Sequence, residues 1–177
     1  MFNDRYGLTR AVLEGRKTMT RRIVNLNRVH TIIPGRIAEC YLKYAPYKVG
    51  EVVAVAQPYK DVIYTGGLPH PLVAKPGWTN KMFVRADLML HKVRITNVRV
   101  ERLQDISDED CLKEGILNCK DDPDFSHVQK DIFYHEGSYD GYLTAREALA
   151  SLIDKVSGKG TFESNPWVFV YEFELVK

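Results

Sequence analysis

The sequence feature that most constrains the fold is the alternation of side chains over residues 166–176. Side chains point to opposite faces of a strand at every second residue, so this pattern predicts a long β-strand with one buried face. The other face carries Glu172 and Glu174, and the second half of the strand is expected to be solvated there. The apolar positions are Trp167, Phe169, Tyr171, Phe173 and Leu175.

Three further segments have the character of strands, and they are residues 18–24, 52–56 and 92–103. In the last of these, Val93 and Ile95 share one parity, whereas Val98 and Val100 share the other. A β-bulge near Thr96 reconciles the two halves, because it adds one residue and shifts the alternation.

Helices are predicted over residues 4–14, from Ser107 to Gly115, and over residues 145–156. The last helix begins behind Thr144 and Glu147, which have the spacing of a capping box. Its apolar residues recur at helical spacing, so it is the clearest amphipathic helix of the chain.

Strands separated by long intervals and interrupted by a few helices predict an α+β fold, a small mixed β-barrel or curled sheet with helices outside. The 177 residues fit a single domain, with a long loop over residues 61–80 and an acidic loop over residues 118–140. An apolar fraction of 45% and a charged fraction of 27% are typical of a soluble globular protein, and they exclude disordered, collagen-like and coiled-coil classes.

No uncharged stretch approaches the roughly 20 apolar residues of a membrane span, and the N-terminal residues lack an apolar signal region. A cytoplasmic protein without membrane partners is therefore expected, and its three cysteines are expected to be reduced. The histidines and cysteines show no metal-binding spacing, so neither a metal nor another cofactor is predicted.

Charge is divided along the chain: residues 1–60 carry a net charge of +7, and residues 101–150 carry −8. A basic first half suits an anionic ligand such as a nucleic acid, although the two halves can equally attract each other within one fold.

The densest basic signal is the segment 15–22, Gly-Arg-Lys-Thr-Met-Thr-Arg-Arg, called the basic motif below. Guanidinium, ammonium and hydroxyl groups bind phosphate oxygens, and the alternative is a solvated basic edge strand. The candidate phosphate-binding residues are Arg16, Lys17, Thr18, Arg21 and Arg22.

Four segments together resemble ASCH-domain proteins of the PUA-like superfamily, in particular those of phages and prophages. The segments are 12–22, 98–106, 110–116 and 165–173. The resemblance implies a PUA-like β-barrel with helices flanking a cleft, and RNA or a nucleoside- or nucleotide-like ligand as partner. One ASCH branch hydrolyses the acetyl amide of 4-acetylcytidine, and its lysine, threonine and glutamate match Lys17, Thr20 and Glu114.

The three matched residue types have a chemistry that suits this reaction. The Thr20 hydroxyl can attack an amide carbonyl if a neutral amine accepts its proton, and neighbouring cations favour the neutral form of Lys17. Glu114 precedes a helix-ending glycine, where the helix dipole raises a carboxyl pKa and favours acid/base work. An ordinary exposed glutamate is the alternative for this position.

The sequence thus leaves three hypotheses. The first is an RNA- or nucleotide-binding domain that uses the basic motif beside a cleft. The second is a metal-independent amidohydrolase of 4-acetylcytidine-like substrates, with Thr20 as nucleophile, Lys17 as base and Glu114 as acid. The third is a non-catalytic, phage-derived interaction protein whose acidic residues 101–150 dock a basic partner.

Overall fold

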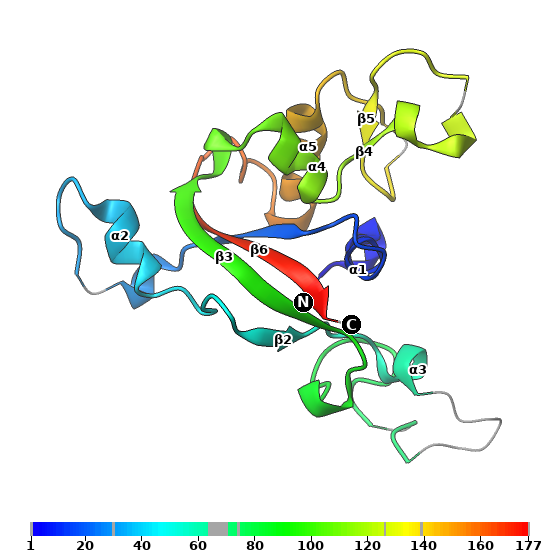
Figure 1. The fold of residues 1–177 in the computed structure, drawn as a ribbon, viewed down its shortest axis with the longest axis horizontal. Helices are drawn as coiled ribbons and strands as arrows, with labels where there is room; N and C mark the ends of the chain where they lie inside the picture. The colour runs from blue at the N-terminus through cyan, green and yellow to red at the C-terminus, as the bar shows by residue number, and fades with distance from the viewer. Residues whose placement is uncertain are drawn as a thin grey trace.

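The computed structural model describes residues 2–29, 31–63, 71–73, 75–125, 127–138 and 140–176. Its central element is an antiparallel sheet in the order β1-β6-β3-β2, which curls into a half-barrel (Figure 1). The fold is therefore mixed α+β, as the spacing of strands and helices predicted. The strands are β1 (Met19–Ile23), β2 (Val52–Ala54), β3 (Lys92–Arg102) and β6 (Trp167–Val176).

The predicted strand is confirmed as β6, and burial alternates along its second half, whereas both faces are buried in its first half. Phe169, Tyr171 and Phe173 are buried on one face, called the aromatic face here, within the largest apolar core. Val168 and Val170 are buried on the opposite face, called the α5 face, against Met19, Leu103 and the helix α5 (Ala145–Ser157). On that same face Glu172 is half-buried and Glu174 is exposed.

The bulge predicted near Thr96 is also confirmed, since the pairing of β3 with β6 shifts register between Ile95 and Asn97. An extra residue in one strand lets both halves of β3 keep apolar side chains toward the core. Strand β3 can therefore follow the curvature of the half-barrel, which Figure 1 shows in green beside the red β6.

Helices α4 (Asp108–Lys113) and α5 pack together beside one end of the sheet (Figure 1). The Ser107 side chain caps α4, and Thr144 with Glu147 forms the predicted capping box of α5. A second apolar core lies between these helices and α1 (Leu8–Leu13). The helices therefore rest on the sheet beside β1, which contains the second half of the basic motif.

The structure corrects two predictions of local structure. The helix expected over residues 4–14 is broken at Gly7, whose φ of 60° is left-handed, into η1 (Asp4–Tyr6) and α1. The acidic loop 118–140 contains a small second sheet of β4 (Leu117–Asn118) and β5 (Phe133–Tyr134).

Several short elements had no counterpart in the sequence prediction. They are η2 (Leu26–Arg28), α2 (Ile37–Leu42), α3 (Tyr59–Val62), η3 (Ala86–Leu88), η4 (Leu103–Asp105), η5 (Cys119–Asp121) and η6 (Pro123–Phe125). Of the predicted loop 61–80, residues 64–70 and 74 lie outside the described residues. In the part of the chain that the structure describes, no helix has the length and apolarity needed to cross a membrane.

Candidate active site

A cleft of about 490 Å³ lies along β1. Among the described strands β1 is an edge, because it pairs with β6 alone. Both faces of an edge strand border the open side of the sheet, so side chains of either parity can line one cleft. Thr20, Arg21 and Arg22 all do so. The remaining walls come from the N-terminal residues 2–4, residues 79–82 and α5.

Lys17 lies just before β1, in the turn that connects α1 to the strand. Its backbone N–H donates to Ala11 O at 2.9 Å, and the N–H of Thr18 donates to Lys113 O at 3.0 Å. These two bonds hold the turn between the end of α1 and the end of α4. Gly115 follows α4 with a φ of 103°, and its position would place a Cβ 3.7 Å from Lys17 Cδ. A left-handed glycine thus ends α4 directly beside the lysine side chain.

The Lys17 side chain is only 2% exposed and ends against Glu114, whose side chain is 6% exposed. Its Nζ donates to Glu114 Oε2 at 2.5 Å and to the Glu114 backbone oxygen at 2.6 Å. Both residues line the cleft, so the buried pair forms part of the cleft wall. The Phe2 ring, also in that wall, has its centroid 5.9 Å from Nζ.

Burial is the main electrostatic influence on Lys17. Loss of hydration, with the positive charges of Arg22 and Arg21, holds the pKa of the Lys17 amine below its ordinary value of 10.5. The carboxylate of Glu114 opposes this shift without cancelling it. At moderate pH the neutral form of the Lys17 amine is therefore more populated than that of an exposed lysine.

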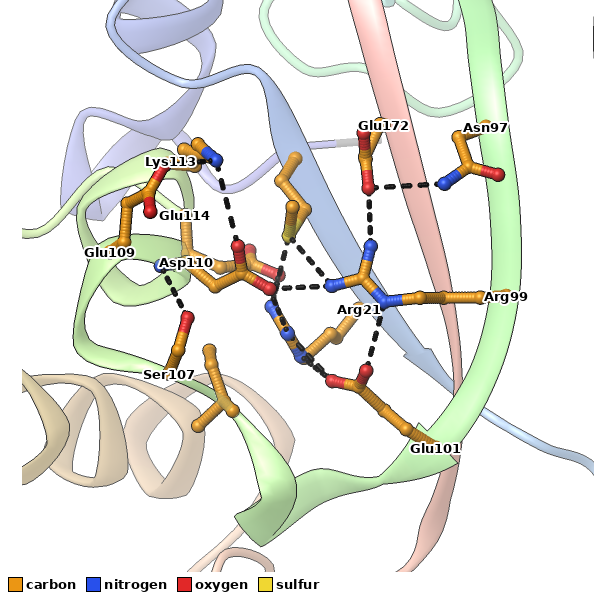
Figure 2. A network of polar contacts seen from close by, with 12 residues as sticks. Arg21, Asn97, Arg99, Glu101, Ser107, Glu109, Asp110, Lys113, Glu114 and Glu172 are labelled. Carbon is orange, nitrogen blue, oxygen red and sulfur yellow. Dashed lines mark hydrogen bonds and ion pairs between the residues drawn. The ribbon is translucent and has the colours of Figure 1, made fainter.

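Glu114 is held from its other side by Arg21, whose side chain is 1% exposed. Arg21 Nη1 donates to Glu114 Oε1 at 3.2 Å, and Nη2 donates to Glu101 Oε1 at 2.7 Å and to Asp110 Oδ2 at 3.0 Å. Figure 2 shows these three carboxylates converging on Arg21 from β3 and from α4 and its end. Arg21 therefore acts as the cation that joins α4 to the sheet.

Arg99 of β3 extends the same network, as Figure 2 shows. It donates to Asp110 Oδ2 at 2.5 Å and to Glu101 Oε2 at 3.0 Å, and it also bonds Glu172. Each carboxylate near Arg21 thus has at least one cationic partner. Such mutual pairing offsets the cost of removing these charges from water.

The structure therefore brings Lys17, Thr20 and Glu114 to one cleft, although 97 residues separate Lys17 from Glu114. Thr20 is half-buried in β1, directly opposite Tyr171 of β6. The catalytic roles of the three residues stay predictions. Lys17 lies before the regular strand, so the alternation of β1 does not force its side chain and that of Thr20 to opposite faces of the sheet.

The five candidate phosphate-binding residues do not form one surface. Arg16 pairs with Glu14 at 2.7 Å and with Glu136 at 3.5 Å, and neither Arg16 nor Thr18 lines the cleft. Lys17 and Arg21 line it but are buried against carboxylates. Arg22 lines the cleft and is exposed. The positive charge of the basic motif is thus largely used within the fold.

Sequence reasoning missed Lys81, which lines the cleft from the segment 79–82. Its Nζ donates to Asp4 Oδ1 at 2.5 Å and to the Phe2 backbone oxygen at 3.0 Å, and it also bonds the Thr9 hydroxyl. These contacts fasten the segment to the N-terminal residues across the cleft wall. No local pattern signals them, because the partners lie more than 70 residues away in the chain.

Among the described residues, no three His, Cys, Asp or Glu side chains are grouped so that they could hold a metal ion. Comparisons of the chain with protein-family models, curated proteins and solved structures found no match. The function proposed below therefore rests on the residues of the site, their geometry and the resemblance of four segments to ASCH-domain proteins.

Proposed function

We propose that the cleft binds a nucleoside-sized ligand and hydrolyses an amide on it, with an acylated cytidine such as 4-acetylcytidine as substrate. The observation that carries this proposal is the buried Lys17–Glu114 pair in the wall of a cleft that Thr20 also lines. A cleft of about 490 Å³ lies within the usual size range of small-molecule sites. We also propose that the half-barrel sheet is a PUA-like β-barrel fold, as the resemblance implies.

The proposed reaction passes through an acyl-threonine ester. Neutral Lys17 accepts the Thr20 hydroxyl proton while Thr20 Oγ bonds to the carbonyl carbon. The C–N bond then breaks, and the amine leaves with a proton that Lys17 returns, aided by Glu114. Water next attacks the ester, giving one proton to Lys17, and the C–O bond to Thr20 breaks as its hydroxyl is restored. The products are the free amine and a carboxylic acid.

Turnover of 4-acetylcytidine tests this proposal, with cytidine release followed by chromatography. We expect Thr20→Ala to lower kcat/KM by roughly 10³-fold or more, because it removes the attacking atom. Thr18→Ala is the matched control, since Thr18 belongs to the same motif but does not line the cleft. Equal activity of the two variants, or no release by the native protein at high enzyme concentration, would contradict the proposal.

The pH dependence of kcat/KM tests Lys17 as the base. Only the neutral amine accepts a proton, and burial lowers the pKa of Lys17, so kcat/KM should rise with pH and level off below pH 10.5. Lys17→Arg keeps the charge but cannot deprotonate, and it should be inactive at every pH. A rate that falls as pH rises from 7 to 9, or an active Lys17→Arg protein, is incompatible with this role.

Binding of RNA or a nucleotide without hydrolysis is the second candidate, and the exposed Arg22 in the cleft favours it. Few cations of the basic motif can contact a ligand in the cleft. The affinity for RNA should therefore decrease only gently as the salt concentration rises, since the dependence of affinity on salt reflects the number of phosphates contacted. Docking of a basic partner by residues 101–150 has less support, because Glu101, Asp110 and Glu114 are already paired with cations of this chain.

A further inference from the structure

A second, smaller cavity of about 100 Å³ lies on the aromatic face of the sheet and is called the slot here. Phe2, Thr20 and Arg22 line both the slot and the cleft, so the two cavities adjoin at Thr20. The rest of the slot is mainly apolar, with walls that include Val53, Ala56, Val93, Ile95 and Phe173. Thr20 thus lies between the cleft, whose wall holds the buried Lys17–Glu114 pair, and the slot.

Tyr171 is the polar residue of β6 in the slot wall. It is directly opposite Thr20 in the β1–β6 pairing, which places the two side chains next to each other on one face. Tyr171 is 1% exposed, and its hydroxyl has no hydrogen-bond partner among the described residues. The backbone N–H of Tyr47 acts on the hydroxyl oxygen and lowers its pKa, but no group among the described residues accepts the hydroxyl proton.

A buried hydroxyl without a partner is uncommon, because nearly all buried polar groups in proteins are hydrogen-bonded. Burial raises the pKa of Tyr171 to about 12, so the hydroxyl keeps its proton and can donate it in a hydrogen bond at neutral pH. A ligand whose acceptor oxygen reaches this hydroxyl inside the slot would satisfy the donor.

We propose that the slot holds the acyl group of the substrate, with the Tyr171 hydroxyl donating a hydrogen bond to the carbonyl oxygen. This inference rests on the proposed amide hydrolysis. When Thr20 attacks the carbonyl carbon, the amine must leave toward its proton donor, Lys17, in the cleft. The acyl chain then extends to the other side of Thr20, into the slot. Tyr171 stabilises the negative charge that develops on the oxygen.

The slot volume sets an upper limit on the acyl group. A protein cavity of about 150 Å³ holds one benzene molecule, and the slot, at about 100 Å³, is smaller. We therefore expect the slot to accommodate acetyl, propionyl and isobutyryl groups better than a benzoyl group.

The test measures calorimetric binding of cytidine and its 4-acetyl, 4-propionyl, 4-isobutyryl and 4-benzoyl derivatives to the Thr20→Ala protein, which leaves the ligands intact. We expect affinity to rise about three- to fourfold for each added methylene from acetyl to isobutyryl. The benzoyl derivative should bind at least tenfold more weakly than the isobutyryl one. In the same background, Val53→Ala should widen the slot and reduce this penalty, while leaving cytidine binding unchanged.

Tyr171→Phe isolates the hydroxyl, because it keeps the aromatic ring. It should weaken binding of 4-acetylcytidine by about two- to tenfold, as for loss of one hydrogen bond, without changing the affinity for cytidine. With Thr20 present it should lower kcat by roughly 10²-fold, as for loss of an oxyanion donor.

Two results would contradict the proposal that the slot holds the acyl group. One is an affinity that does not depend on acyl size, and the other is a Tyr171→Phe change that weakens binding of cytidine and 4-acetylcytidine alike. Turnover by the native protein, measured in parallel, separates this inference from the proposed reaction. Size-dependent binding without turnover supports the slot and contradicts hydrolysis. Turnover with affinity independent of acyl size supports hydrolysis and contradicts the slot.

Discussion

Replacing Lys17 with methionine is expected to lower the free energy of unfolding by about 3–5 kcal/mol and to abolish turnover. The loss arises because Glu114 keeps its buried charge while its ammonium partner, 2.5 Å away, is gone. Urea denaturation measures the free energy, and the acylcytidine assay measures the activity.

Lys113→Met is the matched control, because Lys113 is adjacent to Glu114 and its 2.7 Å pair with Glu109 is solvent-exposed. We expect it to cost less than about 1 kcal/mol, as exposed ion pairs do. The double variant Lys17→Met/Glu114→Gln removes both charges and should recover more than half of the stability lost in Lys17→Met. If Lys17→Met costs no more than Lys113→Met, the pair is not a buried ion pair.

Replacing Arg21 with methionine is expected to have an effect of similar size, about 3–5 kcal/mol, by removing a buried cation from three carboxylates. Buried charges are screened much less than exposed ones, so most of this loss should persist in urea titrations at high salt. Arg21→Lys keeps the charge but loses the planar fork, and it should recover only part of the stability.

Arg22→Met provides the comparison, since Arg22 is the next residue in β1 and is exposed. We expect it to change the free energy of unfolding by less than about 1 kcal/mol. If instead Arg21→Met leaves stability unchanged and weakens only ligand binding, Arg21 contacts the ligand rather than joining α4 to the sheet.

Local patterns predicted the parts of the fold that depend on neighbouring residues. The alternation of β6, the bulge in β3 and the Thr144 capping box are each encoded within a dozen residues. The break at Gly7 was missed, because a glycine is compatible with a helix until its φ is known. The β4–β5 pairing inside the acidic segment was missed because two-residue strands have too few positions to show an alternation.

The candidate site was predictable only as a set of residue types. Sequence patterns pointed to Lys17, Thr20 and Glu114 but also assigned Arg21 to phosphate binding, whereas Arg21 is buried among carboxylates. Its partners Glu101 and Asp110 lie 80 and 89 residues away in the chain. No pattern in the sequence distinguishes a cation that binds a ligand from one that pairs within the fold.

By itself the sequence determined the four strands of the main sheet, the helices α4 and α5 and where the charges are concentrated, because propensity, alternation and capping act between near neighbours. Only the tertiary structure decided that β1 is an edge strand, that Lys17 is buried against Glu114, and that Thr20 lies opposite Tyr171 between a cleft and a slot. The physical reason is that burial and strand pairing depend on contacts between segments far apart in the chain. Those contacts set the pKa of Lys17 and leave the Tyr171 hydroxyl without a partner among the described residues.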